Sequence, residues 1–130
     1  MRRGATAVYH WVALLILAGG VVQFLLAGAG VFGAESFEAH KSLGWILHTA
    51  SIIVVIAAIV GPRTQRAIVL SIALFVVFTI QVMLPGAQDD APWVAAFHPV
   101  LALAVLGLAA QIGMPAISRG REATAPRPAG

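Results

Sequence analysis

The chain has no cysteine and very little charge. Its 130 residues include one Tyr, 10% charged residues and 60% hydrophobic residues. The absence of cysteine excludes disulfides, thiolate metal sites, iron–sulfur clusters and covalent haem attachment. The shortage of charge and the high hydrophobic content exclude both a soluble globular domain and a disordered chain. Histidine, glutamine and a few carboxylates are therefore the side chains left to bind a ligand or to carry protons.

Long charge-free segments dominate the chain. About 20 apolar residues in a helix cross a hydrocarbon core of roughly 30 Å, and only a helix satisfies its own backbone hydrogen bonds there. The sequence therefore predicts an all-α integral membrane protein, a single-domain four-helix up-down bundle. Its helices are expected at about residues 7–28, 37–60, 67–84 and 93–112, with Gly113 to Pro115 closing the last one. The charge-free segments are Gly4 to Ala34, Ser42 to Pro62, Ala67 to Gln88, and Ala91 to Ser118.

The charges are divided unequally between the two sides of the predicted bundle. Seven of the eight basic residues lie on the side of the two termini, and four of the five acidic residues lie in the two connections on the other side. The positive-inside rule makes the terminal side cytoplasmic, and the tail at residues 119–130 is predicted to be disordered. The basic residues behind the net charge of +3 thus set the orientation of the helices in the lipid bilayer, where they lie near anionic lipid headgroups. They give no support for a nucleic-acid partner. The seven basic residues are Arg2, Arg3, Arg63, Arg66, Arg119, Arg121 and Arg127.

Each predicted helix carries one polar side chain near the same depth. A polar side chain within a membrane is costly, so such a residue indicates a functional site. The residues lie in the outer third of the bundle, whereas His10 and Gln111 lie near the inner rim. The depths below the outer helix ends are about 3 Å for His40, about 5 Å for Gln81, about 8 Å for Gln23, about 9 Å for His98 and about 15 Å for His48.

The histidines on the second and fourth predicted helices suit a b-type haem. His40, Gly44 and His48 are spaced by four residues and form a stripe that drifts by about 80°. Gly44 removes a side chain at a place where a flat ligand would rest. Low-spin haem iron needs two axial ligands from opposite sides, and imidazoles on facing helices supply them. We expect His98 to be one ligand and either His40 or His48 to be the other.

The two glutamines have two interpretations. Gln23 and Gln81 are suited to hydrogen-bond a ligand imidazole or a haem propionate, or they join neighbouring helices without any ligand. Their matching positions, each in the helix before a histidine, suggest that the first two helices are echoed by the last two. In the same way His40 is also typical of a headgroup-level residue, and His10 of an interfacial one. A divalent metal at the outer carboxylates lacks any His-x-x-His or Glu-x-x-His spacing.

Three stretches, residues 23–32, 40–44 and 97–102, resemble a family of small bacterial four-helix membrane proteins of unknown function. The resemblance extends from about Tyr9 to Gly113 and implies the same fold without an activity. More distantly, the chain is similar to four-helix membrane cytochromes of the b type and to haem A synthase halves. That similarity implies haem ligation by His40 and His98. It implies at most one haem, because His10 and Gln111 do not provide a second histidine pair.

The sequence therefore leads to two functional hypotheses. The first is a protein of the bacterial cytoplasmic membrane that binds one b-type haem near the outer surface for electron transfer, with a quinone or a redox protein as partner. The alternative is a non-enzymatic structural or assembly subunit, or a homo-oligomer, whose polar residues serve packing. The small-residue runs Ala18 to Gly20 and Ala27 to Gly30 permit close helix contact and favour the alternative.

Overall fold

The computed structural model describes the backbone of residues 1–124 and the side chains of residues 1–118. All elements in this part of the chain are helices, which confirms the predicted all-α class. Four helical segments are long and apolar enough to cross a membrane, as expected for a multi-pass membrane protein. The elements are α1 (Arg2–Val31), α2 (Glu38–Val60), α3 (Gln65–Met83), the 3-10 helix η1 (Leu84–Ala87), α4 (Pro92–Ala95) and α5 (His98–Thr124).

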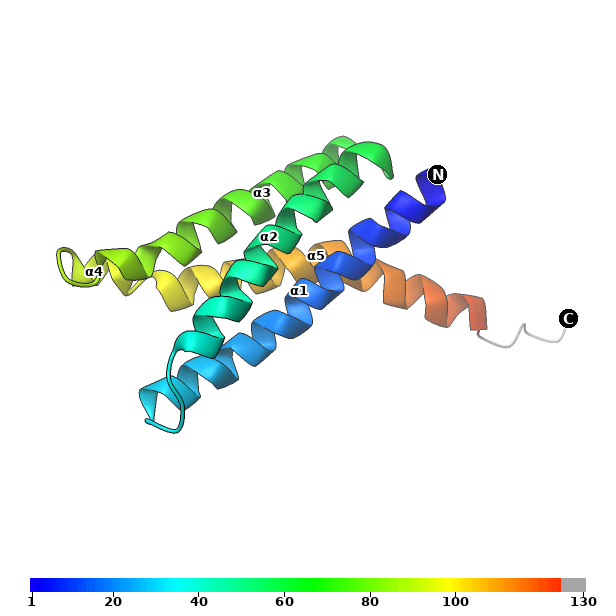
Figure 1. Cartoon of the computed structure of the whole chain (residues 1–130). Coiled ribbons are helices and arrows are strands. Elements are labelled where there is room, and N and C mark those ends of the chain that lie inside the picture. The colour runs from blue at the N-terminus through cyan, green and yellow to red at the C-terminus, as the bar shows by residue number, and fades with distance from the viewer. Residues whose placement is uncertain (125–130) are drawn as a thin grey trace, which may run out of the picture.

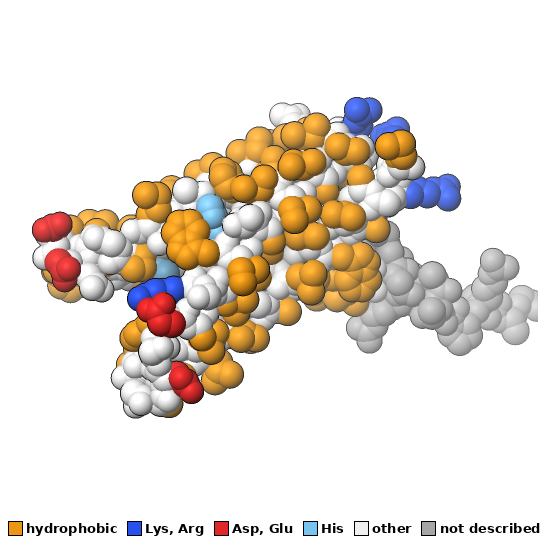
Figure 2. All heavy atoms as spheres, viewed as in Figure 1, with side chains coloured by type: hydrophobic (Ala, Val, Ile, Leu, Met, Phe, Trp, Pro, Cys, Tyr) orange, Lys and Arg blue, Asp and Glu red, His pale blue; other side chains and the backbone are white. Residues whose placement is uncertain are grey.

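The long helices form two hairpins. α1 packs against α2 and α5, and α3 packs against the same two helices, so α2 and α5 lie diagonally across a ring of four. Figure 1 shows that the first hairpin (α1–α2) and the second hairpin (α3–α5) lie close together near the N-terminus and diverge toward the other end. Figure 2 shows acidic side chains at the tips of both diverging arms. We call this the acidic end, and the end with Arg2, Arg3, Arg63 and Arg66 the basic end.

Small residues pack the middle and the basic half of the bundle closely. Ala13, Ala58 and Ala109 are fully buried there. At Gly61 a Cβ atom would lie only 2.7 Å from the backbone nitrogen of Thr6, so α1 and α2 approach each other through their backbones. Such contacts are available only to residues with small side chains. The outer surface carries many exposed large hydrophobic residues, as a lipid-facing flank requires.

The fourth predicted helix is interrupted. α4 ends at Ala95, and α5 begins at His98 rather than continuing from Trp93. Pro99 accounts for the new start, because its missing amide hydrogen is tolerated only where early amides lack helical partners. The main chain is rejoined by a hydrogen bond of 2.9 Å from the Leu101 amide to the Phe97 carbonyl. The interruption makes His98 the first residue of a helix.

The end of α5 differs from the prediction. The helix continues through Pro115 to Thr124, so the expected closure at Gly113 to Pro115 is wrong. A proline removes one backbone hydrogen bond but does not have to end a membrane helix. The tail predicted to be disordered is helical at residues 119–124, and residues 125–130 lie outside the described residues. The second and third predicted helices agree with α2 and α3 to within two residues at each end.

Candidate functional site

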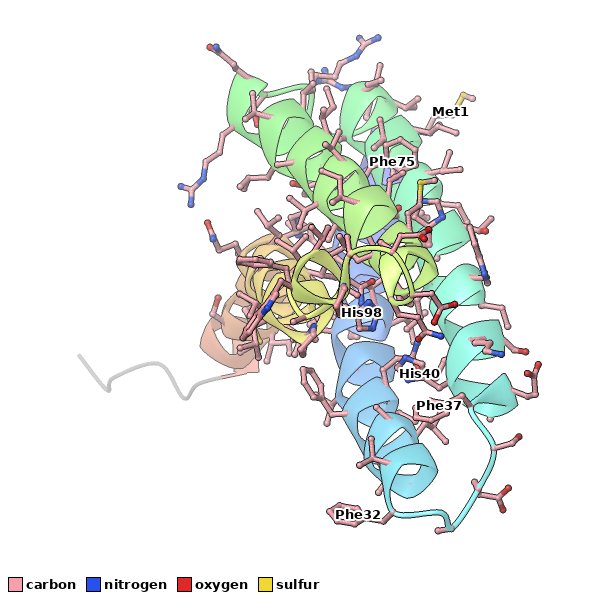
Figure 3. All side chains as sticks on the ribbon, turned by 90° about the vertical axis from the view of Figure 1, so that its left-hand side faces the viewer. Met1, Phe32, Phe37, His40, Phe75 and His98 are labelled. Atoms are coloured by element: carbon pink, nitrogen blue, oxygen red, sulfur yellow. The ribbon has the colours of Figure 1, made fainter. Side chains whose placement is uncertain are left out.

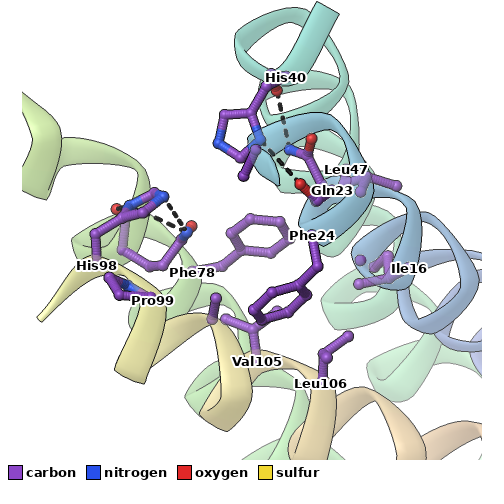
Figure 4. Close-up of a pocket in the computed structure, with 14 residues that line it drawn as sticks. Ile16, Gln23, Phe24, His40, Leu47, Phe78, His98, Pro99, Val105 and Leu106 are labelled. Carbon is purple, nitrogen blue, oxygen red and sulfur yellow. Dashed lines mark hydrogen bonds between the residues drawn. The ribbon is translucent and has the colours of Figure 1, made fainter. Parts of the chain in front are cut away.

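A cavity lies between the diverging hairpins toward the acidic end (Figure 4). Its interior has a volume of ≈ 100 Å³, and ≈ 580 Å³ is free of atoms when the spaces between side chains and the open mouth are counted. The long helices α1, α2, α3 and α5 each contribute one polar residue to its lining. These are the four side chains that the depth estimate placed near one level: Gln23, His40, Gln81 and His98.

The two histidine rings meet across the bundle. The ring centroids of His40 and His98 are 6.0 Å apart, and the ring planes are inclined by 64°. His40 lies in the first turn of α2 and His98 at the start of α5, and both side chains are half-buried. Figure 3, which looks from the acidic end, places the two residues between the hairpins. Side chains of two diagonal helices thus approach each other where the hairpins diverge.

Each histidine is tied to the preceding helix in the same way. The Nδ1–H of His40 donates to the main-chain oxygen of Gln23 at 3.2 Å. The Nδ1–H of His98 donates to the main-chain oxygen of Gln81 at 2.7 Å. A carbonyl oxygen only accepts, so Nδ1 carries the proton in both rings and Nε2 of each neutral ring has a free lone pair. In both hairpins the histidine follows its glutamine by 17 residues, which strengthens the predicted echo between the hairpins.

The glutamine side chains differ between the hairpins. The Gln23 amide nitrogen donates to the main-chain oxygen of His40 at 3.0 Å. The Gln81 amide nitrogen lies 3.2 Å from both ring nitrogens of His98, and only Nε2 is able to accept its hydrogen. Among the described residues nothing hydrogen-bonds the Nε2 of His40. In Figure 4 this nitrogen is on the side of the ring that faces His98.

The two glutamine side-chain oxygens lack partners. Gln23 Oε1 and Gln81 Oε1 are buried and accept no hydrogen bond from any described residue. Gln81 is only 7% exposed, so solvent does not reach it freely. An unsatisfied buried acceptor costs about 1–3 kcal/mol, and each such group in a folded protein calls for an explanation. Both residues line the cavity.

Gly44 does not make room for a flat ligand, contrary to the prediction. A Cβ atom at Gly44 would lie 2.8 Å from the Nε2 atom of Gln23. The missing side chain therefore gives space to the Gln23 amide, which lies between α1 and α2. Gly44 is not among the residues that line the cavity. Its role is to allow the hydrogen bond from Gln23 to the His40 carbonyl.

His48 lies apart from His98 and does not line the cavity. Its Nε2 is 2.9 Å from the hydroxyl of Thr79, which itself donates to the Phe75 carbonyl, so His48 is the donor. Its ring stacks on Phe75 at 5.5 Å and meets Trp45 and Phe78 edge-on. The drift of about 80° between His40 and His48 explains this direction, because it turns the second ring toward α3. In the structure it is therefore His40, and not His48, whose ring meets that of His98.

The other polar candidates lie away from the cavity. His10 donates from Nδ1 to the main-chain oxygen of Ile112 at 2.6 Å, and Gln111 is exposed on α5. Lys41 pairs with the exposed Glu38 at 2.8 Å and is therefore not directed at His40. Among the side chains of residues 1–118, no three His, Asp or Glu come together to hold a metal ion. The structure thus gives no support to a divalent metal at the acidic tips.

Comparison with known families places the chain. A family model described as a family of unknown function (DUF6220) matches residues 23–88. The chain belongs to this family. The match includes Gln23, His40 and Gln81, and it ends before His98. No curated protein and no solved structure matches the chain, and nothing in the comparisons supports the expected similarity to haem cytochromes. The function of this DUF6220 member must therefore be argued from the cavity itself.

Proposed function

We propose that the chain binds one b-type haem between His40 and His98 and transfers electrons near the outer surface of the bacterial cytoplasmic membrane. One observation carries the proposal: two imidazoles meet inside the bundle, and each gives its Nδ1 proton to a main-chain carbonyl. The positive-inside rule then makes the acidic end extracytoplasmic and places both termini in the cytoplasm.

The donor set fits a bis-histidine site. His40 and His98 would hold the iron, one ring from each hairpin. The centroids of His40 and His98 are 6.0 Å apart. A hydrogen bond from Nδ1 to a carbonyl fixes the tautomer that leaves Nε2 available, orients the ring and makes it a better ligand. Both rings have this hydrogen bond before any metal is bound.

The lining of the cavity extends along the bundle axis. On α5 the lining extends from His98 to Leu106, a length of about 12 Å. Ala102 contributes only a small side chain to the wall, whereas the space beside Gly20 is filled by the Leu106 side chain. The interior of ≈ 100 Å³ is smaller than a porphyrin, so binding requires the Gln81 amide to leave His98 and the hairpins to part. The hairpins already diverge at this end, so this movement widens an existing opening (Figure 1).

A haem held there supplies reversible one-electron chemistry. His40 and His98 would both hold the iron, which would leave no place on it for a substrate. The apolar walls exclude water, and burial together with the carbonyl hydrogen bonds sets the reduction potential. This arrangement favours electron transfer, with a quinone or a redox protein as the partner, over catalysis on a bound substrate.

An absorption spectrum tests the proposal. The full chain is expressed in haem-replete cells and purified in detergent, and we expect a Soret band and one haem per chain. His98→Ala should abolish the band, because an apolar methyl group cannot bind iron. His48→Ala is the matched control and should retain it, because the His48 ring faces α3. A colourless wild-type protein from haem-replete cells would overturn the proposal.

A non-enzymatic subunit is the second candidate. Part of the small-residue surface is used within the chain, since a Cβ atom at Gly19 would lie 2.7 Å from Leu47. Gly28 and Gly107, however, face open space, which leaves room for contact with another protein or a second copy. This candidate predicts a colourless protein. Its Gly28→Leu variant would lose assembly in membranes, whereas His98→Ala would leave assembly unchanged.

A further inference from the structure

The two unpartnered oxygens of Gln23 and Gln81 are not explained by a haem. Axial ligation uses the imidazole nitrogens, and ionised haem propionates have no hydrogen to donate. The two oxygens are nevertheless buried, and the residues that carry them line the same cavity, one from each hairpin. Two hydrogen-bond donors between the hairpins would satisfy them, either from two water molecules or from one molecule that carries both donors.

The cavity opens toward the lipid-facing flank of the bundle. Of the residues that line it, only Phe24 on α1 and Pro99 on α5 are exposed, so the mouth lies between these two helices. Apart from the four polar side chains, the lining is apolar or glycine. A molecule that enters through this mouth and is retained by these walls is itself lipophilic.

We infer that the haem-free cavity binds the headgroup of a lipid-soluble quinol, whose hydroxyls donate to the Oε1 atoms of Gln23 and Gln81. The interior of ≈ 100 Å³ is of the order of a cavity of about 150 Å³ known to hold benzene, so a single six-membered ring fits. The two hydroxyls of a quinol lie on opposite edges of its ring, as the two acceptors lie on opposite hairpins. The free Nε2 lone pair of His40 is a third acceptor at the same site.

This inference goes beyond the proposed haem function and does not depend on it. A quinol ring and a porphyrin compete for the same interior, so quinol binding is measured on haem-free protein. The two proposals then have separate measurements, an absorption spectrum for one and a binding titration for the other.

The titration uses a matched pair of probes. The haem-free full-length chain in detergent micelles is titrated with a short-chain benzohydroquinone, kept reduced, and separately with its dimethyl ether. The ether has the same ring but no O–H donor. We expect the ether to bind about tenfold more weakly, because it loses two hydrogen bonds that each contribute roughly a factor of two to ten.

Variants identify the acceptors. Gln81→Leu and Gln23→Leu should each weaken hydroquinone binding by up to about tenfold and leave binding of the ether unchanged. Gln111→Leu removes an exposed amide remote from the cavity and should change neither. Thermal unfolding without ligand shows whether each variant is folded. If a glutamine variant does not fold, the comparison of hydroquinone with its dimethyl ether on the wild-type chain still tests whether the cavity recognises the hydroxyl groups.

Equal affinity for hydroquinone and ether would overturn the inference, because water would then be the donor to both glutamines. Hydroquinone binding that is unchanged in both folded glutamine variants would overturn it as well. A colourless protein that discriminates between the probes retains this inference and loses the haem proposal. If the protein binds haem but its haem-free form binds hydroquinone and ether equally, the haem proposal is retained and this inference is lost.

Discussion

The first hairpin and the second hairpin use the same pair of residue types with one difference. In both, a histidine at the start of the returning helix donates its Nδ1 proton to the main-chain oxygen of a glutamine 17 residues earlier. In the first hairpin the Gln23 amide donates to the main chain of His40, so the ring Nε2 is left open. In the second, the Gln81 amide lies on the ring of His98 itself.

The residue four positions after each histidine accounts for this difference. It is Gly44 in the first hairpin, where a Cβ atom would lie 2.8 Å from the Gln23 amide nitrogen. It is Ala102 in the second hairpin, whose side chain lines the cavity. In the first hairpin the absence of a methyl group at Gly44 leaves room for the Gln23 amide to reach the backbone of His40, and the Nε2 of His40 is left free. The two imidazoles therefore have the same tautomer but are not equally ready to bind a ligand.

The largest expected effect concerns the two histidines together. His40→Ala and His98→Ala should remove haem equally completely, because a bis-histidine site loses its stable low-spin form when either imidazole is lost. The measurement is the haem content of purified protein per chain, determined by its absorption. Full haem retention in His40→Ala would show that the two hairpins do not share one iron.

A double-mutant cycle tests the role of Gly44. Gly44→Ala should destabilise the fold by about 1–2 kcal/mol, because the new methyl group displaces the Gln23 amide. In a Gln23→Ala background the clash is absent, and the same substitution should stabilise by up to about 1 kcal/mol through helix propensity. Unfolding in mixed detergent micelles measures all four free energies. The sign change is the critical result, and equal effects in both backgrounds would contradict our explanation.

Chemical modification compares the two Nε2 atoms directly. An acylating reagent specific for unprotonated imidazole should modify His40 a few-fold faster than His98, since the Gln81 amide covers the latter nitrogen. The rates are read by mass spectrometry of peptides from haem-free protein. Gln81→Ala should raise the rate at His98 to that at His40. Faster modification of His98 in the wild-type chain would mean that Gln81 does not cover its Nε2.

The smallest effect distinguishes packed from open glycines. Gly107 on α5 has no atom within 4 Å of a would-be Cβ, so Gly107→Ala should be neutral or stabilising by up to about 1 kcal/mol. Gly20 on α1 would place its Cβ against the Leu106 side chain, so Gly20→Ala should destabilise modestly. The same unfolding measurement serves for both. A similar loss of stability in both variants would show that Gly107 packs against another chain.

The helices and the depth of the polar residues followed from the sequence. Apolar length and the need to satisfy the backbone predict membrane helices, and the rise per residue predicts that Gln23, His40, Gln81 and His98 share a level. Both arguments depend on distance along a helix. They require no knowledge of how the helices pack, and the structure brings all four residues to one cavity.

The features that depend on rotation and packing did not follow. Counting residues does not give the direction of a ring, so the turn of His48 toward Thr79 was not predicted. The hydrogen bonds from the histidines to the main-chain oxygens of the glutamines leave no signal in the sequence, because every residue has a main-chain oxygen. The use of Gly44 by Gln23 depends on a contact between two helices. Only the proline after His98 gave a local signal, and it marks a helix start that the sequence analysis placed at Trp93.

The electron paramagnetic resonance spectrum of the oxidised, haem-loaded protein, recorded with its haem content, tests the central claim most directly. We predict one haem per chain with a low-spin ferric signal typical of two imidazole ligands, and loss of that signal in both His40→Ala and His98→Ala. A high-spin signal in the wild-type protein, or a protein without haem, would contradict the account.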